Sequence, residues 1–266
     1  MPSVTSPGEH APDGTPFRHP ARPEQKRSLR RAFRHYRELL RDKEATNHVF
    51  HIYDALPSRR SEQLARRLSL SPHGDMLRRK EPYLPDLHDD HAALRQLPKG
   101  SVAHAYCDFM QGEQLTAAGL AEQQKKMGRP RYGDLLEWFS WRQRDTHDLL
   151  HVLTGYGRDA LGEACVLLFT HGHSPSKAHL LLGYSGGVKI RRQVKSKAPV
   201  LKAVREAHRL GADCEGLIHH PVSEILMMDF EKARERFGFR RPDAYHRCHE
   251  VWHLEGHDPA RMLQVA

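Results

Sequence analysis

Two glycines, Gly155 and Gly157, set how the middle of this chain of 266 residues can fold, because they separate two segments with helical patterns. Before them, apolar side chains recur at steps of three and four residues, which predicts a helix over about residues 132–153. Glycine allows the positive φ angles that a helix end and a chain reversal need, so a second helix should start near Arg158. We therefore expect a helical hairpin that pivots at Tyr156.

Metal-ligating side chains stand on both arms of this hairpin. His147 and His151 lie one helical turn apart, and Asp148, about 100° around the helix from His147, can project to the same side. Glu163 would lie about 18 Å from His151 in one unbroken helix, but the reversal brings it between the two histidines. Two imidazoles with one or two carboxylates suit a divalent ion such as zinc, manganese or ferrous iron, with coordination positions left open for catalysis.

A histidine pair at this spacing, taken alone, is weak support for a metal site. The chain has 21 histidines, so pairs four residues apart arise by chance, and a single histidine is more often a surface residue than a ligand. The adjoining Asp148 and the glycine-hinged Glu163 favour the metal site, because they supply the missing ligands at places that the hairpin can use.

A second motif near the end of the chain competes for the same interpretation. Residues His249 to His253 read H-E-x-x-H, which on a helix would place two zinc ligands and a general base as in metallopeptidases. The third histidine of the longer peptidase motif is missing, because His257 follows Gly256 directly. We interpret this stretch as a surface helix, with an accessory metal site and a peptidase as the alternatives.

Composition bounds the remaining possibilities. The net charge of +9 suggests an acidic partner, which anionic lipid satisfies as well as nucleic acid. We find no nucleic-acid recognition motif and expect no such partner.

The four cysteines lack paired close spacing, so neither a zinc ribbon nor a disulfide framework is indicated, and a reducing cytoplasm fits. No apolar run approaches the roughly 20 residues that cross a bilayer.

The chain divides into a tail, a body and an extension. Residues 1–25 are rich in proline and are expected to be disordered. Residues 26–41 predict a basic amphipathic helix that serves either as a core helix or as a membrane or partner contact. We predict an all-α, single multi-helix domain over residues 26–245, with the metal site on the hairpin and an apolar groove between helices. Residues 246–266 then form a C-terminal extension.

The central motif resembles that of a known family. The pattern H-D-x-x-H, eleven residues, then E, running from His147 to Glu163, is similar to the signature of the fourth numbered coenzyme Q (ubiquinone) biosynthesis protein family. The resemblance implies a helical protein that removes the ring carboxylate of a polyprenylated hydroxybenzoate and hydroxylates the same carbon. It also implies a divalent metal held by His147, Asp148, His151 and Glu163, peripheral membrane association and work beside other ubiquinone biosynthesis proteins.

Two hypotheses share these residues. In the first, a metal ion, zinc in preference to iron or manganese, assists decarboxylation, and Arg144 binds the substrate carboxylate. A surface position or a salt bridge with Asp159 is the alternative for Arg144. In the second, the protein is a non-catalytic scaffold that binds metal and prenyl lipid and organises other enzymes. We further expect a homodimer, located in the cytoplasm at the membrane surface if bacterial, and at the mitochondrial inner membrane in eukaryotic relatives.

Overall fold

Helices provide the regular secondary structure, as the sequence predicts. The computed structural model describes residues 9–41, 47–126, 128 and 130–259. Within these ranges there is no strand, and β-type pairing is limited to isolated bridges, of His10 with Pro16 and of Ser101 with Asp229. The all-α prediction is therefore confirmed. No helix in this part of the chain combines the length and the apolar character needed to cross a membrane.

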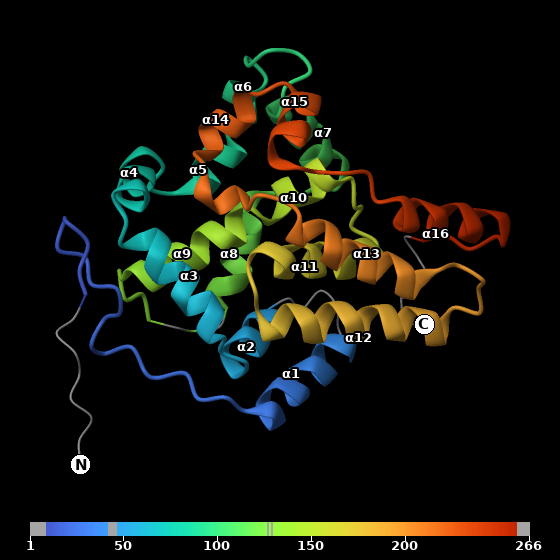
Figure 1. The fold of residues 1–266 in the computed structure, drawn as a ribbon, viewed down its shortest axis with the longest axis horizontal. Coiled ribbons are helices and arrows are strands. Elements are labelled where there is room, and N and C mark those ends of the chain that lie inside the picture. Colours follow the sequence, from blue (N-terminus) through green and yellow to red (C-terminus); the bar gives the residue numbers. More distant parts are fainter. Residues whose placement is uncertain (1–8, 42–46, 127, 129, 260–266) are drawn as a thin grey trace. The chain divides into compact units, whose positions relative to one another are not determined.

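The helices, which Figure 1 labels, belong to two compact units, each assembled from separate stretches of the chain. The first unit draws on residues up to 90, 115–146 and 218–224. Its helices are α1 (Leu29–Arg41), α2 (Asn47–Ala55), α3 (Arg59–Ser69), α4 (Pro72–Lys80), α5 (Leu84–Asp89), α8 (Ala117–Lys125) and α9 (Leu135–Asp145).

The second unit draws on residues 91–114, 147–217 and those from 225 onward. Its helices are α6 (His91–Leu94), α7 (Val102–Gly112), α10 (His147–Thr154), α11 (Ala160–His173), α12 (Lys177–Gln193), α13 (Val200–Ala212), α15 (Phe230–Phe237) and α16 (Asp243–Leu254). A 3-10 turn (Leu217–His219) and α14 (Val222–Met227) lie where the chain passes between the units.

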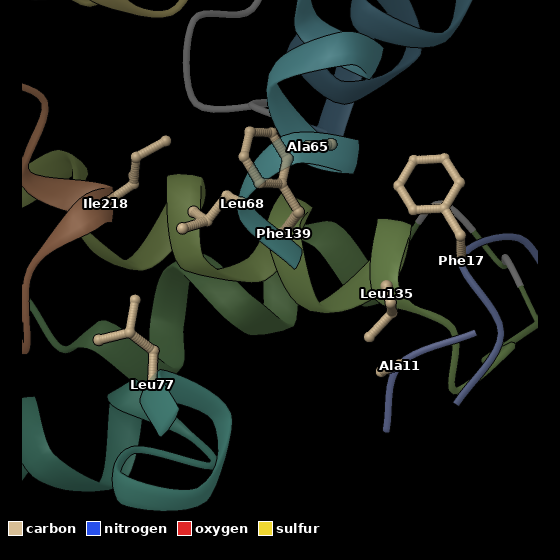
Figure 2. Close-up of a cluster of buried hydrophobic side chains, with 8 residues drawn as sticks. All are labelled: Ala11, Phe17, Ala65, Leu68, Leu77, Leu135, Phe139 and Ile218. Carbon is tan, nitrogen blue, oxygen red and sulfur yellow. The ribbon is translucent and has the colours of Figure 1, made fainter. Parts of the chain in front are cut away.

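A cluster of buried apolar side chains holds the first unit together (Figure 2). It comprises Ala11, Phe17, Ala65, Leu68, Leu77, Leu135, Phe139 and Ile218. Leu135 and Phe139 come from α9, and Ala65 and Leu68 from α3. The members therefore reach the cluster from α3, α4, α9, the 3-10 turn and the N-terminal stretch, which are far apart in sequence, so their burial depends on tertiary packing.

The N-terminal stretch contributes to this core, which corrects one prediction. Composition indicated a disordered tail over residues 1–25, of which residues 1–8 lie outside the described part. In the rest of that stretch, however, Phe17 is only 2% exposed. The N–H group of Leu135 donates to the Pro16 carbonyl at 3.0 Å, and that of Leu136 donates to Phe17 at 3.2 Å. Prolines lower the entropy of the unfolded chain, and the buried Phe17 side chain helps to anchor the segment.

Asp134 ties the same stretch to the start of α9. Its carboxylate accepts a hydrogen bond from the N–H of Glu137 and so caps the helix. It also accepts two from the Arg22 guanidinium, at 2.5 and 2.6 Å, and one from the His19 N–H. Burial opposes ionisation, but Arg22 and these N–H donors hold the pKa of Asp134 below its usual value.

In the second unit, small residues let three helices approach one another closely. A Cβ atom added at Gly211 on α13 would lie 1.9 Å from the Phe169 carbonyl oxygen on α11, so these two helices meet backbone to backbone. A Cβ atom at Gly183 on α12 would lie 2.4 Å from Leu168. This packing buries Ala164, Cys165, Val166, Leu168 and Phe169 of α11, the helix that carries Glu163 in its first turn.

The helix predicted over residues 132–153 is interrupted, which is a second correction. α9 ends at Asp145 and α10 begins at His147, with Thr146 at φ −89° and ψ 0° between them. The Arg142 carbonyl accepts from both the Thr146 N–H, at 3.2 Å, and the Thr146 hydroxyl, at 2.9 Å, a sharing that often bends helices. α9 and α10 are therefore two separate helices.

Candidate metal centre

The turn between α10 and α11 forms the predicted hairpin. Gly155 follows α10 with φ at +78°, the left-handed conformation expected of a helix-ending glycine. Asp159 then caps α11, because its side chain accepts from the N–H groups of Leu161 at 3.0 Å and Gly162 at 3.2 Å. The chain thus reverses between Thr154 and Ala160, and the first turn of α11 comes back beside α10.

Gly157, the second glycine of the turn, does not adopt the positive φ that the sequence predicts. Its small size matters instead, because a Cβ atom at Gly157 would lie 3.0 Å from the Tyr245 hydroxyl oxygen. At Gly162 an added Cβ atom would lie 1.9 Å from the Gly157 carbonyl oxygen. These two glycines let the turn pack directly onto the start of α11.

The hairpin brings His147, His151 and Glu163 together. The Nε2 atoms of the two histidines lie 3.2 Å apart. The Oε2 atom of Glu163 lies 3.6 Å from Nε2 of His147 and 3.5 Å from Nε2 of His151. Three ligand atoms at such mutual distances can share one ion, and among the described residues these three side chains form the group suited to a metal. The expected meeting of the glutamate with both imidazoles is therefore present.

His151 is held in the form that a metal requires. Its Nδ1 atom lies 3.0 Å from the Tyr156 carbonyl oxygen, which can only accept, so Nδ1 carries the proton. When the ring is neutral, Nε2 then presents its lone pair towards His147 and Glu163. The side chain is fully buried, and the Phe109 ring stacks on it with centroids 5.7 Å apart. A carbonyl behind a ligating imidazole is the usual way in which proteins orient a metal ligand.

The charges of the three side chains are coupled. Burial alone would raise the pKa of the Glu163 carboxyl, but His151 and His147 hold that pKa well below its usual range. Burial alone would lower the pKa of His151, but the carboxylates of Glu163 and Asp148 and the Tyr156 carbonyl raise it. The other oxygen of the glutamate, Oε1, lies 3.5 Å from Nε of Arg158. Without a metal ion, Glu163 is thus an anion surrounded by nitrogen donors.

Asp148 and Arg144, the other two predicted site residues, lie elsewhere. Asp148 is outside the three-residue group and acts on His151 through its charge. Arg144 precedes the interruption at Thr146. Its guanidinium donates to both oxygens of Asp145, at 2.6 and 3.0 Å, and to the side-chain oxygen of Gln124. The predicted roles of Asp148 as a ligand and Arg144 as a catalytic residue stay predictions.

Sequence reasoning missed the residues that support the hairpin from α16. Tyr245 donates a hydrogen bond of 2.5 Å to Asp159 and accepts one of 2.9 Å from the Gly157 N–H. Nε2 of His249 lies 3.3 Å from the same carboxylate. Burial opposes ionisation of Asp159, but His249 and Tyr245 lower its pKa. No local pattern signals these contacts, because they join residues that are far apart in sequence.

The competing H-E-x-x-H motif lies on α16, as a helical prediction requires, but it assembles no metal group within the described residues. His249 turns to Asp159, Glu250 pairs with Arg247 at 2.9 Å, and His253 is exposed. The first histidine of the motif therefore supports the hairpin through its contact with Asp159.

The donor set fits a divalent cation. Two imidazole nitrogens and one carboxylate oxygen are the ligands of many catalytic zinc sites and of non-haem iron sites. With three protein ligands, coordination positions remain open for water or a substrate oxygen. His147 and Glu163 are partly exposed, so the group is reachable from solvent. The geometry supports metal binding without selecting among zinc, iron and manganese.

Comparison with known proteins places the chain in a family. The model of the family described as coenzyme Q (ubiquinone) biosynthesis protein Coq4 matches residues 41–243, which include the whole hairpin. The chain is 26% identical over 201 residues to the mitochondrial ubiquinone biosynthesis protein coq4 of Pyrenophora tritici-repentis, covering 75% of this chain and 63% of that protein. It is 30% identical over 105 residues to the mitochondrial ubiquinone biosynthesis protein COQ4 homolog 2 of Culex quinquefasciatus, covering 40% of this chain and 45% of that protein.

The fold has a counterpart among solved structures. A crystal structure of a candidate ubiquinone biosynthesis protein from Nostoc punctiforme PCC 73102 matches with a TM-score of 0.58 and 20% identity, covering 81% of this chain and all of that one. At this identity the likeness concerns the fold alone. The chain spans less than two thirds of the length of the curated relatives named above. Because the family model covers most of the chain, including the hairpin with His147, His151 and Glu163, this protein belongs to the Coq4 family of coenzyme Q (ubiquinone) biosynthesis proteins.

Proposed function

We propose that this protein is a metal-dependent enzyme that removes the ring carboxylate of a polyprenylated hydroxybenzoate and hydroxylates the same carbon. The observation that carries the proposal is the convergence of His147, His151 and Glu163 into an open three-ligand group. Membership of the family supports the pathway, and the relatives named above are called ubiquinone biosynthesis proteins.

Each residue of the group has a distinct task in this proposal. His151 is the fixed ligand, because Tyr156 and Phe109 hold its ring. His147 and Glu163 complete the ligand set from the solvent side, and Asp148 acts as a further ligand or strengthens His151 through its charge. A divalent ion bound there supplies a Lewis acid that stabilises negative charge on a substrate oxygen. The apolar groove for the prenyl tail stays a prediction.

Turnover by the purified protein tests this function. Protein reconstituted with zinc, iron or manganese is incubated in detergent and air with a hydroxybenzoate that carries a short prenyl chain. Air is needed because replacing a carboxylate by a hydroxyl group oxidises the ring. We expect the hydroxylated, decarboxylated product by mass spectrometry with the wild type, and loss of both product and bound metal in His147→Ala. Tight substrate binding without product in all metal forms would instead favour the scaffold role.

We propose further that α1 contacts a membrane surface. Leu29 and Phe33, one helical turn apart, are 62% and 61% exposed, and arginines flank them along the helix. Each basic residue close to an anionic membrane contributes about 1 kcal/mol to binding, and the apolar pair adds burial in the interface. A homodimer and association with other ubiquinone biosynthesis proteins are proposed alongside, from the family resemblance.

Vesicle cosedimentation tests the α1 contact. We expect the wild type to pellet with phosphatidylglycerol vesicles more than with phosphatidylcholine vesicles, and Phe33→Asp to stay in the supernatant. Met227→Asp, which alters an exposed apolar residue of α14, is the matched control and should behave as the wild type. Equal pelleting of both variants would contradict the proposal that α1 contacts the membrane.

A further inference from the structure

Arg158 stands at the rim of the metal centre on a fixed piece of backbone. The residue before it, Gly157, donates its N–H to Tyr245, and the residue after it, Asp159, caps α11 and is held by Tyr245 and His249. The Arg158 side chain itself is 36% exposed, with Nε 3.5 Å from Oε1 of Glu163. The main chain is thus anchored on both sides, while the guanidinium faces both solvent and the ligand group.

The two oxygens of Glu163 divide their contacts. Oε2 faces the two imidazoles, and Oε1 faces Arg158. A dication shared with the histidines would take up the negative charge that now attracts the guanidinium. The attraction of the guanidinium to Glu163 would then weaken, which leaves it able to pair with an anion that occupies the open positions.

We propose that Arg158 binds the anionic group of a ligand at the open positions of the metal centre, and that this ligand is a planar carboxylate. The inference rests on the proposed function. Guanidinium presents parallel N–H donors that match a carboxylate in bidentate fashion, which a lysine ammonium cannot do. Arg158 is therefore a residue that selects acidic substrates and positions the carboxylate that is to leave.

The structure favours Arg158 over Arg144, the candidate predicted from sequence. The guanidinium of Arg144 is buried, and its donors are used by Asp145 and Gln124. Freeing it for a ligand would break the buried contact with Asp145, which is costly. The contact of Arg158 with Glu163 is longer and more exposed, so a ligand can replace it at little cost.

The experiment measures metal and probe separately on the full chain. Each variant is loaded with Co²⁺, the bound metal is quantified, and 4-hydroxybenzoate is titrated in by calorimetry while the visible spectrum of cobalt is followed. The variants are Arg158→Gln, Arg158→Lys and Arg209→Gln, the last changing an exposed arginine on α13 of the same unit. Circular dichroism verifies that each variant is folded.

We expect Arg158→Gln to bind cobalt with unchanged stoichiometry and to bind the probe about tenfold or more weakly than the wild type, the size typical of losing a charge-assisted bidentate contact. Arg158→Lys should bind the probe with an affinity between those of Arg158→Gln and the wild type. Arg209→Gln should bind it as the wild type does. Probe binding equal to that of the wild type in Arg158→Gln, or none in the cobalt-loaded wild type, overturns the inference. A wild type that binds no cobalt overturns the proposed function instead, so the two failures are distinguishable.

Discussion

Tyr245 donates a hydrogen bond of 2.5 Å to Asp159, a residue 86 positions earlier in the chain, and accepts another from the Gly157 N–H. One phenol group thereby joins α16 to both the turn and the cap of α11. Since Glu163 lies in the first turn of α11, the position of a candidate metal ligand depends on α16, whose own sequence contains the H-E-x-x-H motif.

Tyr245→Phe removes this link while keeping the ring. The variant leaves a mostly buried Asp159 carboxylate and a Gly157 N–H group without their phenol partner, so we expect the free energy of unfolding to fall by about 1–3 kcal/mol in urea titrations. Tyr184→Phe is the matched control, because its hydroxyl bonds His208 in a more accessible place of the same unit, and a smaller loss is expected there. Equal losses in both variants would contradict a special role for Tyr245.

The close contact at Gly162 provides a second test. A methyl group there would overlap the Gly157 carbonyl oxygen, so Gly162→Ala must push the turn away from α11 and displace Glu163. We expect zinc affinity, measured by competition with a chelator, to fall at least tenfold, the loss that misplaced supporting groups commonly cause. Gly112→Ala, whose added methyl meets nothing within 4 Å, should bind zinc as the wild type does.

The raised pKa of His151 predicts opposite pH dependences for stability and for metal binding. In the metal-free protein, the protonated imidazole beside Glu163 contributes stability below the unfolded pKa of about 6.5, and this contribution disappears as the pH rises through the folded pKa. Metal binding needs the neutral imidazole, so the affinity rises over the same interval and protons are released. The low pKa of Glu163 keeps that carboxylate ionised throughout.

Calorimetric zinc titrations in buffers of different ionisation enthalpy check this prediction. Proton release near neutral pH should be largest in the wild type and smaller in His151→Ala. The same release in both proteins would show that another group carries the proton. His253→Ala, which removes an exposed histidine of α16, controls for the loss of a histidine outside the ligand group.

The N-terminal stretch gives a prediction for stability. Phe17 is buried against α3 and α9, and removal of a buried phenylalanine side chain usually costs about 3–5 kcal/mol. We expect Phe17→Ala to lower the free energy of unfolding by an amount in this range, whereas Phe33→Ala, on the exposed side of α1, should change it by about 0.5 kcal/mol or less. An unchanged free energy of unfolding in Phe17→Ala would instead support the prediction, made from composition, that this stretch is disordered.

These residues show which features the sequence can predict. The roles of Gly155 and of the histidine pair can be predicted from the sequence, because helix periodicity and positive φ are local properties and the hairpin geometry follows from them. The interruption at Thr146 cannot be predicted in this way, because a threonine inside an apolar helical pattern is common. Contacts across long separations, such as Tyr245 with Asp159 or Phe17 with α9, are decided by packing, which periodicity does not encode.

The three ligands differ in how far they reach solvent: the side chain of His151 is fully buried, that of His147 is 25% exposed and that of Glu163 is 36% exposed. The solvent side of the centre is therefore formed by the glutamate and the outer imidazole, and the inner imidazole lies behind them. A chelator should consequently approach a bound ion past Glu163 and His147, the two ligands that would hold it on that side.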